Sequence, residues 1–241
     1  GKTKYTSNSG LVELRQAIAA YCERRFHVSY NGDTDCLITV GGSEAIDLCF
    51  RVLLSEGDEV VMGEPSFVCY GPLTGMSNGV YVPIATKAED KFRLKAEDLK
   101  RAITPKTKLL VLSYPNNPTG AILERSDLEA IADIVRGTDI IVIADEIYGE
   151  FTYSGKTHVS IAELPGMKER TIIVSGFSKA FAMTGWRLGY ALGPRELIAA
   201  LTKLHQHGIM SAPTIAQYAA LTALEKAEDD VREMMKVYDM R

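Results

Sequence analysis

The feature that most constrains this chain is an apolar, β-branched run that ends in small and hydroxylic residues followed by a lysine. Residues 171–174 have the composition of a strand buried on both faces. Residues 175–178 (Ser-Gly-Phe-Ser) lead to Lys179, and a second apolar run begins at Leu188. Open α/β sheets bind ligands beyond the carboxyl ends of their strands, which is where this lysine falls. The ordinary alternative is that Lys179 is an exposed loop residue. The small, hydroxylic and aromatic residues next to Lys179 argue against that alternative.

Similar apolar runs recur along the chain and predict the other strands of a sheet, at residues 36–40, 58–62, 80–84, 108–113 and 140–144. Helical apolar spacing lies between several of them and begins first at Leu11. Ser126 is expected to cap one such helix, and residues 213–241 are expected to form one long helix. Strands that alternate with helices predict a three-layer α/β/α fold, an open and mostly parallel sheet with helices on both faces.

The composition excludes several kinds of protein. The 241 residues are 46% hydrophobic, enough for one sizeable core, and the net charge of −4 argues against a nucleic-acid surface. No apolar run has the length of a membrane span, and no signal peptide opens the sequence. The scattered cysteines are expected to be reduced thiols of a cytoplasmic protein: Cys22, Cys36, Cys49 and Cys69.

The two histidines at His205 and His207 raise the question of a metal site. No third ligand lies near them in the sequence, and the cysteines form no C-x-x-C pair. No metal is therefore expected, and both histidines are interpreted as surface or interface groups.

Polar side chains follow two of the strongest strands. Asn117 lies in the turn Asn-Asn-Pro-Thr-Gly after residues 108–113, and the prolines and the glycine fix this turn. Asp145 follows residues 140–144, and Tyr148 comes shortly after it. A carboxylate at the end of a buried strand requires a partner, which a ligand or an ordinary ion pair can supply.

Glycines separate the strand at residues 36–40 from the helix after it. Gly41 and Gly42 precede Ser43 and Glu44, where the helix is expected to begin. Backbone amides at such a helix start can approach an anion, and the helix dipole adds attraction. A plain turn is the alternative for a glycine pair taken alone.

These segments together resemble one family. The string S-K-A-F-A-M-T-G-W-R-L-G-Y from Ser178 is close to the cofactor-lysine signature of class I and II aminotransferases, the aspartate aminotransferase superfamily. These are pyridoxal phosphate (PLP) enzymes of fold type I. The strings T-V-G-G-S-E-A-I, N-N-P-T-G and A-D-E-I-Y resemble further family elements in the same order. The resemblance covers nearly the whole chain and implies the fold of the PLP-binding large domain.

The resemblance implies a role for each residue around the PLP ring. Lys179 would form a Schiff base with PLP and later move the α-proton of the substrate. Asp145 would keep the pyridine nitrogen protonated, while Asn117 and Tyr148 would share the O3′ oxygen. Phe67, in the string E-P-S-F, would stack on the ring, where many relatives have tryptophan or tyrosine.

The resemblance also implies a phosphate site. The guanidinium of Arg187 would hold the phosphate. The backbone of Gly42, Ser43 and Glu44 would bind it too, whereas the Glu44 carboxylate would take no part.

One departure from the family concerns the phosphate site. Many relatives have a phosphate-binding serine three residues before the lysine, and this chain has Gly176 there. Ser175, Ser178 or the backbone could replace it. By resemblance, Tyr5 would reach the phosphate of the partner subunit in a homodimer; a mobile terminal tyrosine is the alternative. Tyr70 is expected on the substrate side of the site.

The implied function is transfer of an amino group from an amino acid to a 2-oxo acid. Another PLP enzyme of the same fold, such as a carbon–sulfur lyase, and a PLP-sensing domain of a transcription regulator remain alternatives. Residues 1–241 would form the large domain, with residues 213–241 leading into a small domain that this sequence lacks. The arginine that binds the substrate α-carboxylate would lie beyond Arg241, so a protein ending there is expected to bind PLP but to transaminate poorly.

Overall fold

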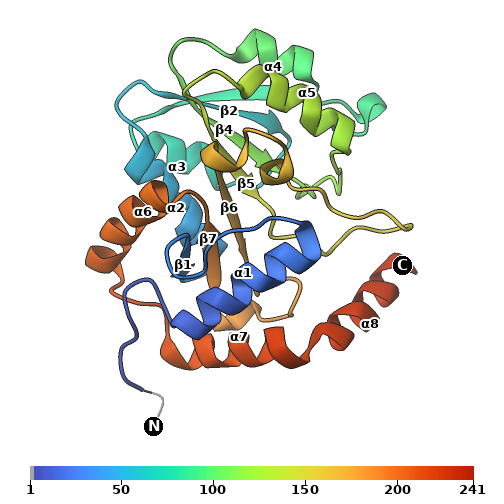
Figure 1. Ribbon diagram of the computed structural model, residues 1–241. Coiled ribbons are helices and arrows are strands. Elements are labelled where there is room, and N and C mark those ends of the chain that lie inside the picture. The colour runs from blue at the N-terminus through green and yellow to red at the C-terminus, as the bar shows by residue number, and fades with distance from the viewer. Residues whose placement is uncertain (1–2) are drawn as a thin grey trace.

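A seven-stranded sheet runs through the middle of the protein, and the computed structural model describes residues 3–241 (Figure 1). The strand order is β1-β7-β6-β5-β4-β2-β3, with β7 antiparallel to both of its neighbours and the other pairs parallel. The strands are β1 (Cys36–Thr39), β2 (Glu59–Glu64), β3 (Val80–Ala85), β4 (Thr107–Ser113), β5 (Ile141–Asp145), β6 (Thr171–Gly176) and β7 (Gly189–Leu192). The open, mostly parallel sheet expected from the sequence is confirmed.

Helices cover both faces of this sheet (Figure 1). One face carries α1 (Val12–Phe26), α4 (Ala96–Ala102), α5 (Arg125–Val135) and α7 (Thr214–Lys226). The other face carries α2 (Gly42–Leu53), α3 (Tyr70–Met76) and α6 (Arg195–Gly208), and α8 (Glu228–Asp239) follows α7. Short 3-10 helices lie at Ala88–Asp90, Ile161–Glu163, Lys168–Arg170 and Thr184–Trp186. The three-layer α/β/α architecture is thus confirmed.

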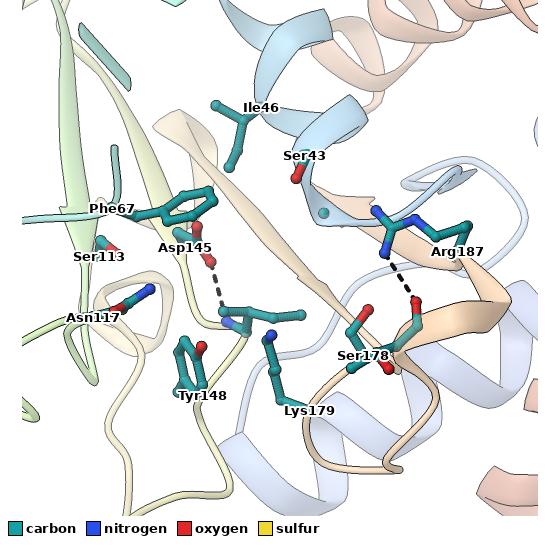
Figure 2. A pocket seen from close by; sticks show the side chains of 13 residues that line it. Ser43, Ile46, Phe67, Ser113, Asn117, Asp145, Tyr148, Ser178, Lys179 and Arg187 are labelled. Carbon is teal, nitrogen blue, oxygen red and sulfur yellow. Dashed lines mark hydrogen bonds between the residues drawn. The ribbon is translucent and has the colours of Figure 1, made fainter. Parts of the chain in front are cut away.

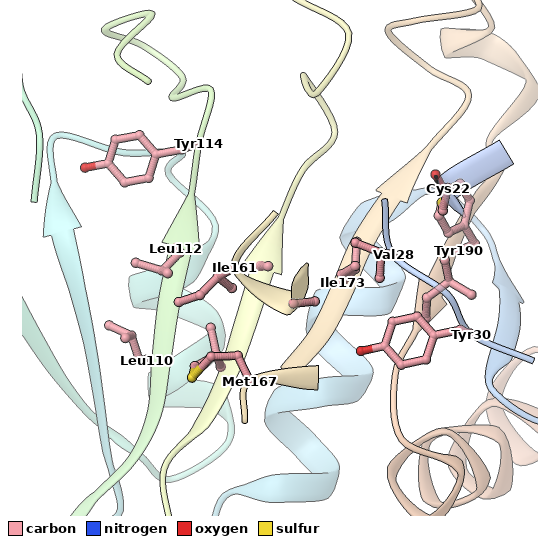
Figure 3. Close-up of a cluster of buried hydrophobic side chains, with 14 of the residues drawn as sticks. Cys22, Val28, Tyr30, Leu110, Leu112, Tyr114, Ile161, Met167, Ile173 and Tyr190 are labelled. Atoms are coloured by element: carbon pink, nitrogen blue, oxygen red, sulfur yellow. Dashed lines mark hydrogen bonds between the residues drawn. The ribbon is translucent and has the colours of Figure 1, made fainter. Parts of the chain in front are cut away.

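Alternation along the strands builds one apolar core on each face. In β4, Leu110 and Leu112 pack into the core under α1, α5 and α7, while Leu109 and Val111 pack under α2 and α6. Figure 3 shows part of the first core, where strand residues such as Ile173 meet side chains from outside the sheet. Because both faces are covered, the central strands are apolar at nearly every position, as parallel strands generally are.

The topology brings several strand ends to one edge of the sheet. Ser113 of β4 pairs with Asp145 of β5, and Asp145 pairs with Val174 of β6. At the same edge, Gly189 of β7 pairs with both Thr39 of β1 and Gly176 of β6. The loops that follow β1, β4, β5 and β6, and the loop that precedes β7, therefore converge on a single region.

Two expectations about helices were wrong. Glu124, not Ser126, caps α5. The Glu124 side chain accepts a hydrogen bond from the backbone amide of Asp127. In return, the backbone amide of Glu124 donates to the Asp127 carboxylate at 2.9 Å. The residues expected to form one long helix form α7 and α8, which are separated at Ala227. Three acidic residues in the first turn of α8 favour a new helix start there, because they complement its positive end.

A buried carboxylate joins α1 to the loop after β5. The side chain of Glu150 is 6% exposed and receives Arg25 Nε at 3.0 Å, Arg25 Nη2 at 2.6 Å and Tyr21 Oη at 2.5 Å. Burial raises the pKa of Glu150, but the hydrogen bonds from Arg25 and Tyr21 outweigh burial, so its pKa is lowered. The ionised form of Glu150 therefore stabilises the folded state.

Replacing this carboxylate is expected to destabilise the protein. Hydrogen bonds to charged groups contribute about 1.5–3 kcal/mol, so Glu150→Gln should lower the free energy of unfolding by about that amount in urea denaturation. Glu233, in an exposed pair with Lys236, provides the control, and Glu233→Gln should change stability by less than about 0.5 kcal/mol.

The effect of Glu150→Gln should also depend on pH. A lowered pKa in the folded state means that the stabilisation is present above the ordinary glutamate pKa and is lost as the pH falls through the lowered value. The difference between wild type and Glu150→Gln should therefore shrink in acid. A difference that stays constant with pH would contradict the ion pair as its cause.

Candidate active site

A cavity of about 150 Å³ opens at the edge where the strand ends converge. Figure 2 shows its labelled side chains around the cavity, and they come from β4, β5, α2 and the loops after β2, β4, β5 and β6. The lining residues are Gly42, Ser43, Ile46, Phe67, Ser113, Asn117, Asp145, Ile147, Tyr148, Ser178, Lys179, Thr184 and Arg187. Most of the site residues predicted from the sequence are thus gathered in one cavity.

Lys179 enters this cavity from the loop after β6. Its Nζ lies 5.7 Å from the centroid of the Tyr148 ring, and Figure 2 shows the two side chains facing each other. Among residues 3–241, no carboxylate forms an ion pair with Lys179. The amine is half-buried and is available to a ligand in the cavity.

Asp145 is a buried acid that lacks a cationic partner within the described chain. It is 5% exposed, and it accepts hydrogen bonds from Tyr70 Oη at 2.6 Å and from Ile147 N at 3.2 Å. Burial raises the pKa of Asp145, and these two hydrogen bonds oppose that rise. A cationic group bound in the cavity would complete its environment and keep it ionised.

Tyr70 is the site residue that the sequence interpretation misplaced. It was expected on the substrate side, but Tyr70, the first residue of α3, is fully buried and does not line the cavity, and its hydroxyl donates to Asp145. Phe67 lines the cavity, and its ring packs edge-on against the Tyr70 ring, with the two centroids 6.1 Å apart. Burial is the largest cause that raises the pKa of Tyr70, followed by the charge of Asp145, so Tyr70 stays a donor.

The other end of the cavity has hydrogen-bond donors that could hold an anion. Gly42 and Ser43 begin α2, so their amides are among those left free at a helix start. Arg187 lies opposite and donates from Nη1 to the carbonyl of Thr184 at 3.0 Å, which leaves most of its donors free (Figure 2). Gly41 has φ +82°, a conformation that favours glycine, and a Cβ added there would lie 2.7 Å from Arg187 Nη2.

Close packing explains why no serine stands three residues before the lysine. A Cβ on Gly176 would lie 2.8 Å from Gly189 Cα and 2.9 Å from the Leu188 carbonyl oxygen, too close for any side chain. Of the two serines that could replace it, Ser178 lines the cavity. Ser175 does not, because its hydroxyl points to the Glu146 carbonyl at 3.3 Å.

Two other predicted residues lie outside the cavity lining. The carboxylate of Glu44 is directed away from the cavity and pairs with His205, which fits the prediction that only its backbone faces the anion. Tyr5 is 81% exposed at the surface, so its predicted contact with a partner subunit stays a prediction. His205 is fully buried, so its interpretation as a surface or interface group was wrong; His207 is exposed as expected.

The family of this chain follows from comparison with known proteins. The family described as "Aminotransferase class I and II" matches residues 1–240. The chain belongs to this family. The cofactor of these enzymes is PLP, a planar ring with a basic nitrogen and a phosphate.

Individual relatives agree with this assignment. A putative aminotransferase of Bacillus subtilis, YugH, is 46% identical over all of this chain and 62% of the relative. An aspartate aminotransferase of Pyrococcus abyssi is 42% identical over 243 residues, again 62% of the relative. The structure of an aromatic aminotransferase from Pyrococcus horikoshii superimposes with a TM-score of 0.96 at 42% identity, covering all of this chain and 65% of that one. The chain therefore spans less than two thirds of the length of these relatives.

The cavity fits this cofactor at both ends. The free donors of Arg187 and of the α2 start match a phosphate, and the glycines leave room for close approach. The unpaired carboxylate of Asp145 matches a protonated ring nitrogen, and Lys179 provides an amine for the aldehyde. In the intervening space Phe67 offers an apolar ring face.

The glycine packing predicts a sensitive position. A Cβ on Gly189 would lie 2.5 Å from both Gly41 C and Gly42 N, so Gly189→Ala must push the α2 start away from the sheet. Overpacking costs about 1–3 kcal/mol, and we expect PLP affinity to fall about 5- to 150-fold in a fluorescence titration. Gly185→Ala is the control, because nothing lies within 4 Å of its added Cβ. Equal affinity in the two variants would contradict this role of the packing.

Tyr70 yields a second prediction for the site. Without its hydroxyl, Asp145 loses a donor that favours its ionised form, so Tyr70→Phe should weaken PLP binding about tenfold. Tyr81→Phe is the matched control, because Tyr81 also donates to a carboxylate, that of Glu64, away from the cavity. If both variants bind PLP as the wild type does, Tyr70 has no part in the site.

Proposed function

We propose that the intact protein is a PLP-dependent aminotransferase that moves an amino group from an amino acid to a 2-oxo acid. The observation that carries this proposal is that Lys179 and the buried, cation-free Asp145 line one cavity, with the anion-binding end formed by Arg187 and the α2 start. The family match over nearly the whole chain supports the same reaction class.

The residues of the chain would divide the work. When bound, PLP supplies an aldehyde for condensation with amino groups and a ring that accepts electrons once its nitrogen is protonated. Lys179 Nζ would hold the aldehyde carbon before substrate arrives and then carry the proton away from the substrate Cα. Asp145 would stay ionised against the ring nitrogen, and Phe67 would cover one ring face.

Two polar groups would hold the O3′ side of the ring. Asn117 and Tyr148 both line the cavity and come from the loops after β4 and β5. We propose that they share hydrogen bonds to the phenolic oxygen of PLP, Asn117 as donor. The Tyr148 ring beside Lys179 would also limit water around the amine.

We further propose that residues 1–241 are the PLP-binding large domain of a two-domain enzyme. The coverage supports this, since the curated relatives are longer and this chain matches 62% of the first of them. In the proposed arrangement α7 and α8 lead toward the small domain, and an arginine of that domain binds the substrate α-carboxylate.

A homodimer is part of the proposal. Tyr5 and several apolar side chains at the turn between α6 and α7 are exposed: Ile209, Met210 and Ile215. The N-terminal loop lies against this turn, since Asn8 Nδ2 donates to the Met210 carbonyl at 3.0 Å. In such a dimer Tyr5 would reach the phosphate in the partner subunit. Each site would then need both chains.

A cytoplasmic location is also proposed, and the four cysteines, all present as free thiols, support it. In the described part of the chain, no helix has the length and apolar character needed to span a membrane.

The reaction type can be tested with the intact protein loaded with PLP. An amino acid alone should convert the cofactor to its amine form, seen as a change in visible absorbance, and a 2-oxo acid should reverse the change. Lys179→Ala should lower the rate of both half-reactions about 10²–10⁴-fold, because the group that carries the proton is lost.

Other outcomes of this experiment favour the alternatives. From a sulfur-containing amino acid, a carbon–sulfur lyase would release a thiol or sulfide, ammonia and a 2-oxo acid without leaving the cofactor as the amine. A PLP-sensing domain would bind the cofactor and turn over neither substrate. Either outcome would contradict the proposed aminotransferase.

A further inference from the structure

A buried histidine lies directly behind the start of α2. In α6, Ile198, Leu201 and His205 share the face that packs on the sheet side, and the side chain of His205 is completely buried. The helical spacing therefore carries this imidazole into the core, although the next histidine, His207, stays exposed. Neither histidine lines the cavity described above.

His205 meets a carboxylate on α2. Its Nδ1 lies 2.7 Å from Oε1 of Glu44, whose side chain is 14% exposed. The other oxygen, Oε2, accepts a short hydrogen bond from the backbone amide of Val40. Val40 precedes Gly41, and Glu44 follows Ser43, so one carboxylate spans the whole turn at the start of α2.

The pair is anchored at three places in the fold. Val40 continues from the end of β1, Glu44 belongs to the first turn of α2, and His205 belongs to α6. The turn between them contains Gly41 at φ +82° and delivers Gly42 and Ser43 to the cavity. The two glycines have no side chains to hold this turn. The packing of Gly189 and the bond from Thr39 Oγ1 to the Gly41 carbonyl fix one side of it, and the Glu44 carboxylate ties its two ends together.

The second ring nitrogen of His205 shows that the pair is a costly arrangement. Its Nε2 is buried and has no hydrogen-bond partner among residues 3–241. A buried polar atom without a partner costs about 1–3 kcal/mol, and an apolar side chain would avoid that penalty. Within the described chain, the one polar contact that offsets this cost is the Nδ1 bond to Glu44.

We propose that His205 is a positioning residue that, through Glu44, holds the turn of residues 40–43 in the geometry that binds the phosphate of the cofactor. It acts without touching the cofactor. The inference rests on the proposed PLP site and adds to it a residue on α6 that sets the phosphate contribution to affinity.

The test compares two ligands that differ in the phosphate. The intact protein and its variants are titrated with PLP and with pyridoxal, which has the same ring and aldehyde but no phosphate. His205→Phe fills the space without the Nδ1 bond, and Glu44→Met removes the carboxylate that joins His205 to Val40. Both should bind PLP about tenfold more weakly than the wild type, with pyridoxal affinity unchanged within about twofold.

Two further variants separate positioning from general stability. His205→Asn places an amide donor near the position of Nδ1 and should recover most of the PLP affinity. His207→Ala changes an exposed neighbour and should leave both affinities unchanged. Thermal unfolding of each variant shows whether it is folded, and Glu44→Met and His205→Asn carry the test if His205→Phe does not fold.

Each result bears on a defined claim. Wild-type affinities for PLP in all folded variants, or equal losses for PLP and pyridoxal, would overturn the positioning role. A wild-type protein that binds neither ligand would instead overturn the proposed PLP site, and the inference with it.

Discussion

The close approach of three backbone segments determines the shape of the cavity. These segments are β6, β7 and the turn before α2. Gly189 of β7 contacts the turn before α2 so closely that a Cβ would lie 2.5 Å from Gly41 C and Gly42 N. Gly176 of β6 also packs against Gly189, since a Cβ on Gly176 would lie 2.8 Å from Gly189 Cα. These contacts place the α2 start beside the loop of Lys179. The absence of side chains here leaves room at the proposed anion-binding end of the cavity. The same packing explains why a glycine stands at position 176, where many relatives have a serine.

Electrostatics sets the opposite end of the cavity. Asp145 is held at the end of a central strand by neutral donors, Tyr70 Oη and Ile147 N, with no cation from the described chain. A buried carboxylate in such surroundings is unfavourable until a positive group joins it. A ring with a protonated nitrogen would meet this requirement, and Arg187 would hold the phosphate of such a ligand. In the proposed site the two ends would together favour one elongated ligand with a cationic ring and an anionic tail.

Local sequence was sufficient for the fold class and for most of the cavity. Asn117, Asp145 and Lys179 each follow a strongly apolar strand, so topology alone brings them together. Tyr70 and His205 were misplaced because their direction depends on how a helix is rotated against the sheet, and a tyrosine or histidine is compatible with either face. The break at Ala227 was missed because apolar spacing continues across it, while the acidic start of α8 is a weaker signal. Ser175 lies outside the cavity because its hydroxyl is directed to the Glu146 carbonyl, a contact between β6 and the β5 loop.

The central claim is that Lys179 is the residue to which PLP attaches. The most direct measurement is borohydride reduction of the PLP-loaded intact protein, followed by proteolysis and mass spectrometry of the labelled peptide. The account predicts a single phosphopyridoxyl label on Lys179 and no label in Lys179→Ala. A label on another lysine, or no label in a protein that binds PLP, would contradict it.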